Sequence, residues 1–287
     1  MTKIKKGIIL SGGSGTRMYP MTSALSKQFL PIFDKPMIYY PLTTLMESGI
    51  NDILVICNRD DLTLFNKLLG SGNQWGINIS YEVQENPNGI AEAFIIGEKF
   101  IQNDNVALIL GDNIIYGSSV KKTLSSLASN HHGASIFGYE VSDPERYGVA
   151  GFDEKGLLES IEEKPKNPKS NFAITGLYFY ESEVIDVAKG LKPSKRGELE
   201  ITDINNYFLQ KKKLNFNKFD LGSAWLDAGT SSSLLSASEF ISTLQERQGI
   251  LIGSPELAAL ENKWINEDDI KSFFGLKIKS NYTNQIL

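Results

Sequence analysis

The sequence has very little cysteine and histidine: its 287 residues include one cysteine, Cys57, and two histidines, His131 and His132. A single thiol excludes an intrachain disulfide, and its place in the apolar run 53–57 is typical of a buried strand residue. Such sparing use of cysteine fits the cytoplasm. The adjacent histidines stand just before a glycine, which indicates a surface turn rather than a catalytic base.

The sequence also lacks long apolar runs and an excess of basic residues. No stretch approaches the roughly 20 apolar residues that a membrane-spanning helix needs, and the first apolar segment is too short for the core of a secretion signal. With 29 Lys and Arg against 34 Asp and Glu, the formal net charge is −5. Broad nucleic-acid binding needs a basic face. We therefore expect a soluble cytoplasmic protein without membrane or nucleic-acid partners.

The remaining composition is that of an ordinary globular protein, with 41% hydrophobic and 22% charged residues. In the first half, short apolar runs alternate with amphipathic segments, which predicts an α/β fold with a Rossmann-like, doubly wound sheet. The predicted strands span residues 7–11, 53–57, 77–83 and 106–110. The predicted helices are one that starts at Pro36 and two that span 60–69 and 90–101.

The pattern changes after about residue 130, where strands with few helices between them predict an antiparallel or mixed extension of the sheet. These strands span 134–140, 147–152, 157–162 and 172–180, and helices follow at 182–189, 201–211 and from about 231. No Gly/Ser-rich linker separates the parts. We therefore expect one continuous core over residues 1–238, with a helical C-terminal region, residues 239–287, packed on it.

A glycine-rich segment follows the first predicted strand: Leu10-Ser11-Gly12-Gly13-Ser14-Gly15-Thr16-Arg17. Glycines let backbone N–H groups approach an anion, and an arginine adds a planar cation that suits phosphate oxygens. The Gly-Lys-Ser/Thr of a Walker loop is missing, and Met18 stands where a dinucleotide fingerprint has its third glycine. The segment therefore predicts a phosphate-binding loop that is neither a Walker loop nor a dinucleotide fingerprint. The alternative is a glycine-rich turn that binds no ligand.

Two aspartates each follow an apolar segment: Asp112 follows residues 106–111, and Asp227 follows residues 224–226. Open α/β sheets bind ligands at the carboxyl ends of their strands. Mg²⁺ prefers hard oxygens and commonly uses one or two carboxylates together with phosphates. The two residues are candidate Mg²⁺ ligands, although their spacing does not pair them. The alternatives are a turn or capping role for Asp112 and a helix N-cap for Asp227.

A charged pair, Glu163-Lys164, stands at the end of the strand predicted over 157–162, just before Pro165. A lysine there would bind a phosphate group as a point charge, and the neighbouring carboxylate would accept hydrogen bonds from sugar hydroxyls. The alternative is a solvated charge cluster.

Together these motifs resemble the sugar nucleotidyltransferases, and among them the bacterial glucose-1-phosphate thymidylyltransferases. The resemblance covers about residues 4–265. The further motifs that carry it are Ser26-Lys27-Gln28 and residues 34–42, 110–113, 143–149, 162–165, 175–180, 197–203 and 224–227.

The resemblance implies a role for each matching residue. Arg17, Lys27 and Lys164 would be catalytic, and Mg²⁺ would be held by Asp112 and Asp227. The implied nucleotide-binding residues are Leu10, Gly12, Gly13, Ser14, Gly15, Thr16, Gln28, Gln84, Pro87, Gly89 and Asp112, with Gln84 and Gly89 facing the base. The implied sugar-phosphate residues are Tyr147, Gly148, Glu163, Lys164, Thr175 and Arg196.

The reaction implied by the resemblance is thymidylyl transfer from dTTP to glucose 1-phosphate, which gives dTDP-glucose and pyrophosphate and opens dTDP-rhamnose or dTDP-deoxysugar synthesis. A homotetramer is also implied, with nucleotide binding in about residues 1–130 and sugar binding in about 131–238. In-line attack by an anionic phosphate needs alignment and charge stabilisation but no general base. That requirement fits a chain poor in histidine.

Two positions depart from the family pattern: Leu221 and Glu261 stand where relatives carry arginines of a second nucleotide site used in feedback inhibition. We therefore expect weaker feedback inhibition by the end-product nucleotide sugar. Three alternative functions stay open at this point: the same chemistry on UTP or another sugar, a catalytically dead nucleotide-sugar sensor, and a glycosyltransferase. The last commonly uses an Asp-x-Asp motif, and Gly111-Asp112-Asn113 lacks the second aspartate.

Overall fold

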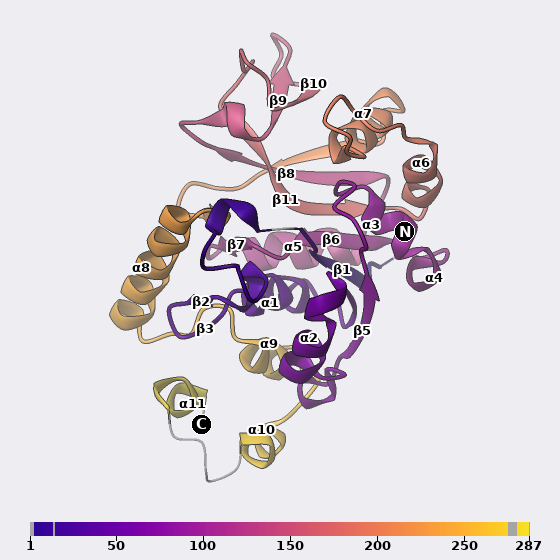
Figure 1. Cartoon of the computed structure of the whole chain (residues 1–287). Helices are drawn as coiled ribbons and strands as arrows, with labels where there is room; N and C mark the ends of the chain where they lie inside the picture. The colour runs from indigo at the N-terminus through magenta and orange to yellow at the C-terminus, as the bar shows by residue number, and fades with distance from the viewer. Residues whose placement is uncertain (1–2, 14, 275–279, 287) are drawn as a thin grey trace.

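The computed structural model describes residues 3–13, 15–274 and 280–286, and a nine-stranded mixed sheet forms its centre (Figure 1). One half of the sheet is parallel: β1 pairs with β4 and β6, and β4 pairs with β5. The strands of this half are β1 (Lys6–Ser11), β4 (Asp52–Cys57), β5 (Asn78–Val83) and β6 (Val106–Leu110). All four were predicted, with ends that differ by at most one residue.

The other half of the sheet is mostly antiparallel and joins the first where β11 pairs with β6. The strands are β8 (Ala134–Glu140), β9 (Gly148–Phe152), β10 (Leu158–Glu163), β11 (Phe172–Tyr180) and β12 (Leu214–Lys218). β11 pairs with β8 and β9, β9 pairs with β10, and β12 pairs with β8 in parallel. The expected extension of the sheet is therefore confirmed, and β12 was not anticipated.

Two short ladders lie outside the main sheet. β2 (Pro31–Ile32) pairs with β3 (Lys35–Pro36), and β7 (Asn113–Tyr116) pairs with β13 (Ala224–Asp227). The second ladder sets Asp227 opposite Asn113. It therefore brings together the two aspartates that sequence spacing left unpaired.

Helices cover both faces of the parallel half, as expected when strand residues alternate between two apolar faces. α1 (Tyr39–Glu47), α2 (Leu62–Leu69) and α5 (Val120–Ser129) contribute to the core that contains Ile9. The core that contains Ile8 is completed by α3 (Glu92–Ile96), α4 (Glu98–Ile101), α6 (Val184–Gly190) and α7 (Ile201–Gln210).

The C-terminal helices pack against the core. The Trp75 indole donates a hydrogen bond to Glu256 Oε1 at 3.1 Å, and Asn262 Nδ2 donates to the Met46 carbonyl at 2.9 Å. These helices are α8 (Ser231–Gln248), α9 (Pro255–Glu261), α10 (Glu267–Phe274) and α11 (Asn281–Ile286). Among the described residues, no helix is long and apolar enough to cross a membrane. The expected domain bounds remain a prediction.

Two local expectations were wrong. The helix does not start at Pro36, which lies in β3; α1 begins at Tyr39 and tolerates Pro41 because the first turn has no N–H partners to lose. The surface turn holds for His132 but not for His131, which is 1% exposed and packs edge-on against Phe179. Cys57 is buried in β4, as expected.

Candidate active site

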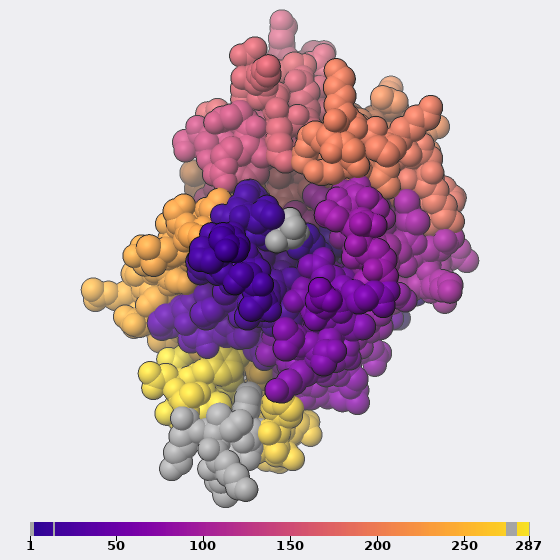
Figure 2. All heavy atoms as spheres, in the orientation of Figure 1, coloured from indigo at the N-terminus to yellow at the C-terminus, as the bar shows by residue number. Residues whose placement is uncertain are grey.

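A cavity of about 220 Å³ lies between the parallel and antiparallel halves of the molecule. In Figure 2 the indigo N-terminal segment, which supplies one side, lies directly below the pink and orange segments that supply the other. Seven residues predicted for the site line this cavity: Arg17, Asp112, Tyr147, Gly148, Glu163, Lys164 and Asp227.

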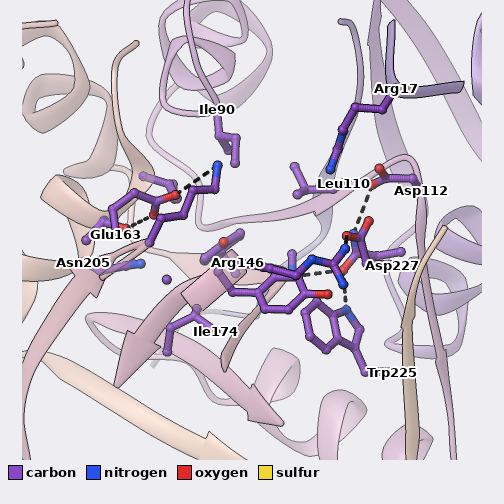
Figure 3. Close-up of a pocket in the computed structure, with 18 residues that line it drawn as sticks. Arg17, Ile90, Leu110, Asp112, Arg146, Glu163, Ile174, Asn205, Trp225 and Asp227 are labelled. Atoms are coloured by element: carbon purple, nitrogen blue, oxygen red, sulfur yellow. Dashed lines mark hydrogen bonds and ion pairs between the residues drawn. The ribbon is translucent and has the colours of Figure 1, made fainter. Parts of the chain in front are cut away.

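The acidic end of the cavity is formed by Asp112, directly after β6, and Asp227 at the end of β13 (Figure 3). Burial raises the pKa of Asp112, but the Lys27 ammonium and hydrogen bonds from Lys27 and Asn113 outweigh burial and hold the pKa below its usual value. The pKa of Asp227 is raised, by burial and by repulsion from Asp112. The two carboxylates therefore form one electrostatic unit that favours a cation.

Asn113 joins the segments that carry this acidic pair. Its Nδ2 donates to Asp112 Oδ1 at 3.1 Å, and its Oδ1 accepts from the Trp225 indole at 2.5 Å and from the Gly176 N–H at 3.0 Å. The residue is 2% exposed. Sequence reasoning missed this role because Asn113 was read only as the absent second acid of an Asp-x-Asp motif.

Three cations surround the acidic pair. Lys27 Nζ pairs directly with Asp112 Oδ2, and Arg146 Nη2 lies 4.0 Å from Asp227 Oδ2. Arg17 approaches from the glycine-rich segment: a Cβ placed on Gly229 would lie 3.0 Å from Arg17 Nη2 and 2.9 Å from Asp227 Oδ1. Arg146 had no assigned role in the sequence analysis, although it stands inside the 143–149 motif.

The opposite side of the cavity carries Glu163 (Figure 3), and Lys164, the next residue in the chain, also lines the cavity. Glu163 accepts a hydrogen bond from Thr202 Oγ1 at 2.7 Å and pairs with Lys164 at 3.6 Å and Arg196 at 3.4 Å. Lys164 has a backbone φ of 45°, an uncommon left-handed value for a side-chain-bearing residue. Its N–H donates to the Tyr147 carbonyl at 2.9 Å, which holds this conformation at the end of β10.

The loop after β5 carries the residues expected to face the base. Gln84 is 5% exposed, and its Nε2 donates to Glu92 Oε2 at 2.7 Å. Gly12 lies so near Gln84 Oε1 that a Cβ there would collide with it. Gly89 has a φ of 111°, and a Cβ there would strike the backbone of Leu199. The loop is therefore held close to both the glycine-rich segment and the antiparallel half.

The glycine-rich segment also faces a second cavity of about 340 Å³, lined by Gly13 and Pro87 among others. Gly15 precedes the 3-10 turn η1 (Thr16–Met18), and Leu10 and Gln28 are 9% and 2% exposed. Ser14 lies outside the described residues. Of the predicted nucleotide residues, Asp112 thus lines the first cavity, whereas Gly13 and Pro87 line the second.

Comparisons with known proteins show the family to which this chain belongs. A sequence profile of the family described as nucleotidyl transferase matches residues 6–243. The chain is 51% identical over 282 residues to a glucose-1-phosphate thymidylyltransferase of Neisseria meningitidis serogroup A, with 98% of each chain covered. It is 49% identical over 282 residues to the protein of that name from Mycobacterium tuberculosis, again with 98% of each covered. The chain belongs to the nucleotidyl transferase family.

Solved structures share the fold of this nucleotidyl transferase. A Bacillus anthracis crystal structure, named as a glucose-1-phosphate thymidylyltransferase in complex with sucrose, is similar at a TM-score of 0.76 and 42% identity, over 82% of this chain and 94% of that one. A UDP-glucose pyrophosphorylase with UDP-glucose reaches a TM-score of 0.73 at 27% identity, over 84% and 99%. The predicted fold class is thereby confirmed.

Some expectations for the nucleotidyl transferase site need correction. Thr175 does not line the cavity: it is fully buried, whereas its neighbours Ile174 and Gly176 do line it. Alternate strand residues point to opposite faces, which accounts for the difference. Asp227 is not the cap of α8, because Thr230 accepts the capping hydrogen bond from the Ser233 N–H.

The two positions that depart from the family pattern lie away from this cavity. Leu221 is fully exposed, and Glu261 pairs with Lys121 at the surface. Neither residue lines the cavity. The expectation of weaker feedback inhibition stays a prediction.

Proposed function

We propose that this nucleotidyl transferase joins dTTP to α-D-glucose 1-phosphate. An oxygen of the sugar phosphate attacks the α-phosphorus of dTTP, the bond from that phosphorus to the β-bridging oxygen breaks, and pyrophosphate leaves in line. The products are dTDP-glucose and pyrophosphate. Relatives of about 50% identity over almost the whole chain bear the name of this activity.

The observation that carries the proposal is the arrangement of charges in the 220 Å³ cavity. One end holds two carboxylates with three cations around them, and the other holds Glu163 and Lys164. Such an arrangement offers positive charge to the phosphates of two different substrates on opposite sides of the cavity. Catalysis then reduces to alignment and charge stabilisation, in which no side chain needs to form a covalent intermediate.

The cations have separate tasks in this reaction. Arg17 and the glycine-rich segment hold the β- and γ-phosphates and stabilise the charge of the departing pyrophosphate. Lys27 positions the phosphates beside Asp112. Arg146 neutralises charge near Asp227, and its guanidinium, 5.2 Å from the Tyr147 ring, is kept in place by a 2.7 Å contact with Asp143.

We propose Mg²⁺ as the cofactor, held by Asp112 and Asp227. The residues fit a hard divalent cation because two buried carboxylates repel each other and offer only oxygen ligands. Among the described residues, no group of three His, Cys, Asp or Glu side chains could hold a metal, so phosphate oxygens and waters would complete the shell. When bound, the ion would stabilise negative charge on the transferring phosphates.

The remaining residues select the substrates. Glu163 accepts hydrogen bonds from sugar hydroxyls, and Tyr147 and Gly148 border the same pocket. Lys164 binds the sugar phosphate, with Arg196 at the rim. Gln84 reads the base from the loop after β5, where Glu92 orients its amide.

The test is pyrophosphate release over a matrix of dTTP, UTP, CTP, ATP and GTP against the 1-phosphates of glucose, galactose, mannose and glucosamine. We expect the highest kcat/KM for dTTP with glucose 1-phosphate. No release from any pair would overturn the proposal. Higher kcat/KM for UTP would favour uridylyl transfer. This reaction is the second candidate because the chain is similar to a UDP-glucose pyrophosphorylase.

The cellular setting is also a proposal. We propose a cytoplasmic homotetramer that supplies dTDP-glucose to dTDP-rhamnose or dTDP-deoxysugar synthesis. The family resemblance and the single cysteine support it. Sedimentation at micromolar concentration tests the assembly, for which a mass of about 32 kDa, that of one 31.8 kDa chain, would refute the tetramer.

A further inference from the structure

Asn58, directly after β4, holds the backbone of the glycine-rich segment. Its Oδ1 accepts a hydrogen bond from the Gly13 N–H at 3.2 Å, and its Nδ2 donates to the Gly13 carbonyl at 3.0 Å. One side chain therefore binds both peptide groups of a single loop residue, 45 positions away in the chain. This two-point contact fixes the orientation of the segment as it leaves β1.

Asp61 extends the contact to a second segment. Its carboxylate is buried and accepts hydrogen bonds from the Ser26 N–H at 3.3 Å, from Ser26 Oγ, and from Asn58 Nδ2 at 3.2 Å. Ser26 is the residue before the 3-10 turn η2 (Lys27–Phe29), and Lys27 pairs with Asp112. A continuous series of contacts thus runs from Gly13 to the acidic pair.

We propose that Asn58 and Asp61 are positioning residues for nucleotide binding, because they lock the glycine-rich segment and the Lys27 turn into one rigid unit. The inference rests on the proposed function, in which these two segments bind the triphosphate. Neither residue touches the acidic pair or the sugar side of the cavity. They act through Gly13 and Ser26, and they lower the ordering cost that a mobile glycine segment would add to nucleotide binding.

The contact also determines which backbone N–H groups of the glycine-rich segment can bind phosphate. The Gly13 N–H already donates to Asn58 Oδ1 and is therefore not available to a phosphate. The N–H groups that meet the phosphates are then those nearer Arg17. Loss of the Asn58 amide would free Gly13 and let the whole segment change direction.

The test compares Asn58→Ala with Asn66→Ala, a control on α2 whose Nδ2 donates only to the Leu62 carbonyl of its own helix. Each substrate is titrated while the other is saturating. Asn58→Ala removes both hydrogen bonds to Gly13 and the contacts of Nδ2 with Ser26 and Asp61. We expect its KM for dTTP to rise about tenfold, while the KM for glucose 1-phosphate changes less than twofold. Asn66→Ala should match the wild type. Equal rises in both KM values would reduce Asn58 to a general structural role and overturn the inference.

A second measurement does not depend on activity. Hydrogen exchange should accelerate over residues 12–17 and 24–28 in Asn58→Ala and in Asp61→Ala, while β4 stays protected. The double variant should raise the KM for dTTP less than the product of the single effects, since both residues serve one network. Multiplicative effects, or unchanged exchange at the glycine-rich segment, would overturn the inference. An inactive wild type would instead refute the proposed function.

Discussion

The two walls of the cavity hold their charges in different ways. On the wall at the ends of β6 and β13, Asp112 and Asp227 expose only 10% and 16% of their side chains, and Asn113 ties their segments together. On the opposite wall, Lys164 exposes 47% of its side chain, and Arg196, which pairs with Glu163 of that wall, exposes 40%. Buried and hydrogen-bonded groups keep one geometry, whereas long exposed side chains adapt.

The difference between the walls matches the different geometric requirements of the two steps of the proposed reaction. Bond exchange at phosphorus needs fixed alignment, so the pre-organised wall suits the metal and the triphosphate. Capture of a sugar phosphate tolerates adjustment, so the adaptable wall suits the second substrate. Substitutions on the first wall should therefore lower kcat, and those on the second should mainly raise KM.

The largest effects are expected from Asp112→Asn and Asp227→Asn. Each variant removes a charge that we assign to the metal, so kcat should fall about 10²–10³-fold. The melting temperature should change little in Asp227→Asn, whereas Asp112→Asn should also lower it because Lys27 loses its carboxylate partner. Turnover and calorimetry check this. The control is Asp153→Asn in an exposed turn. Near wild-type turnover in either active-site variant would remove that residue from the metal site.

Asn113→Asp tests whether Asn113 holds the Asp112 and Asp227 wall in a fixed geometry. The variant keeps an acceptor for Trp225 and Gly176 but replaces the donor to Asp112 with a third carboxylate. Partners behind metal ligands typically matter by 10–100-fold, and we expect kcat to fall by about that much. The metal concentration for half-maximal activity should shift as well. Wild-type metal dependence would mean that Asn113 serves packing alone.

Gln84→Ala tests how the parallel half reads the base. A buried amide that pairs with a pyrimidine edge is left unsatisfied by a purine, which costs about 1–3 kcal/mol. The variant should lose most of its preference for dTTP over ATP, measured as the ratio of kcat/KM values. If the ratio stays at the wild-type value, the base is recognised elsewhere.

Lys164→Ala tests whether the wall that carries Glu163 and Lys164 binds the sugar phosphate. Because this side chain is half exposed, we expect a moderate effect: about a tenfold rise in the KM for glucose 1-phosphate, with the KM for dTTP within twofold of wild type. Lys166→Ala, an exposed lysine two residues further on, is the matched control. Similar losses for both substrates would contradict the division between the walls.

The smallest effect on activity is expected from a group on neither wall. Burial, and to a lesser degree Glu261, raise the pKa of Glu47 on α1 from 4.5 to about 7, despite the opposing charge of Lys121. The unfolded chain ionises Glu47 first, so the free energy of unfolding should decrease as pH rises from about 4.5 to about 7, by about 3 kcal/mol. Urea unfolding of wild type and Glu47→Gln checks this. Equal slopes against pH would refute it.

Most of the fold could be predicted from periodicity. β6, β8 and β11 were predicted to the residue, because uninterrupted apolar runs bounded by polar turns leave little freedom in placing strand ends. The short ladders β2–β3 and β7–β13 could not be found in this way, since two to four residues carry no period. The helix predicted to start at Pro36 was wrong for a different reason: proline fits the edge of a strand as well as the start of a helix.

The site could be predicted less completely. Residues inside long motifs, such as Asp112 and Lys164, were correctly placed at the cavity because their residue type and neighbours indicate their chemistry. Asn58 and Arg146 were missed as functional residues, since their importance depends on which distant backbone or carboxylate they face. Thr175 was misplaced because a motif does not say to which face of a strand each side chain points.

The pairing of β7 with β13 also determines at which stage of synthesis the two aspartates can come together. Asn113 and Trp225 are 112 residues apart in the chain. The parallel half emerges from the ribosome first and has all its own strands long before β13 is made. Until that late strand docks, Asp112 stands without its partner carboxylate. A nascent or truncated chain that ends before β13 would therefore hold the proposed nucleotide-binding loops without the second carboxylate of the proposed metal site, so the proposed chemistry would begin only after Asp227 has been made.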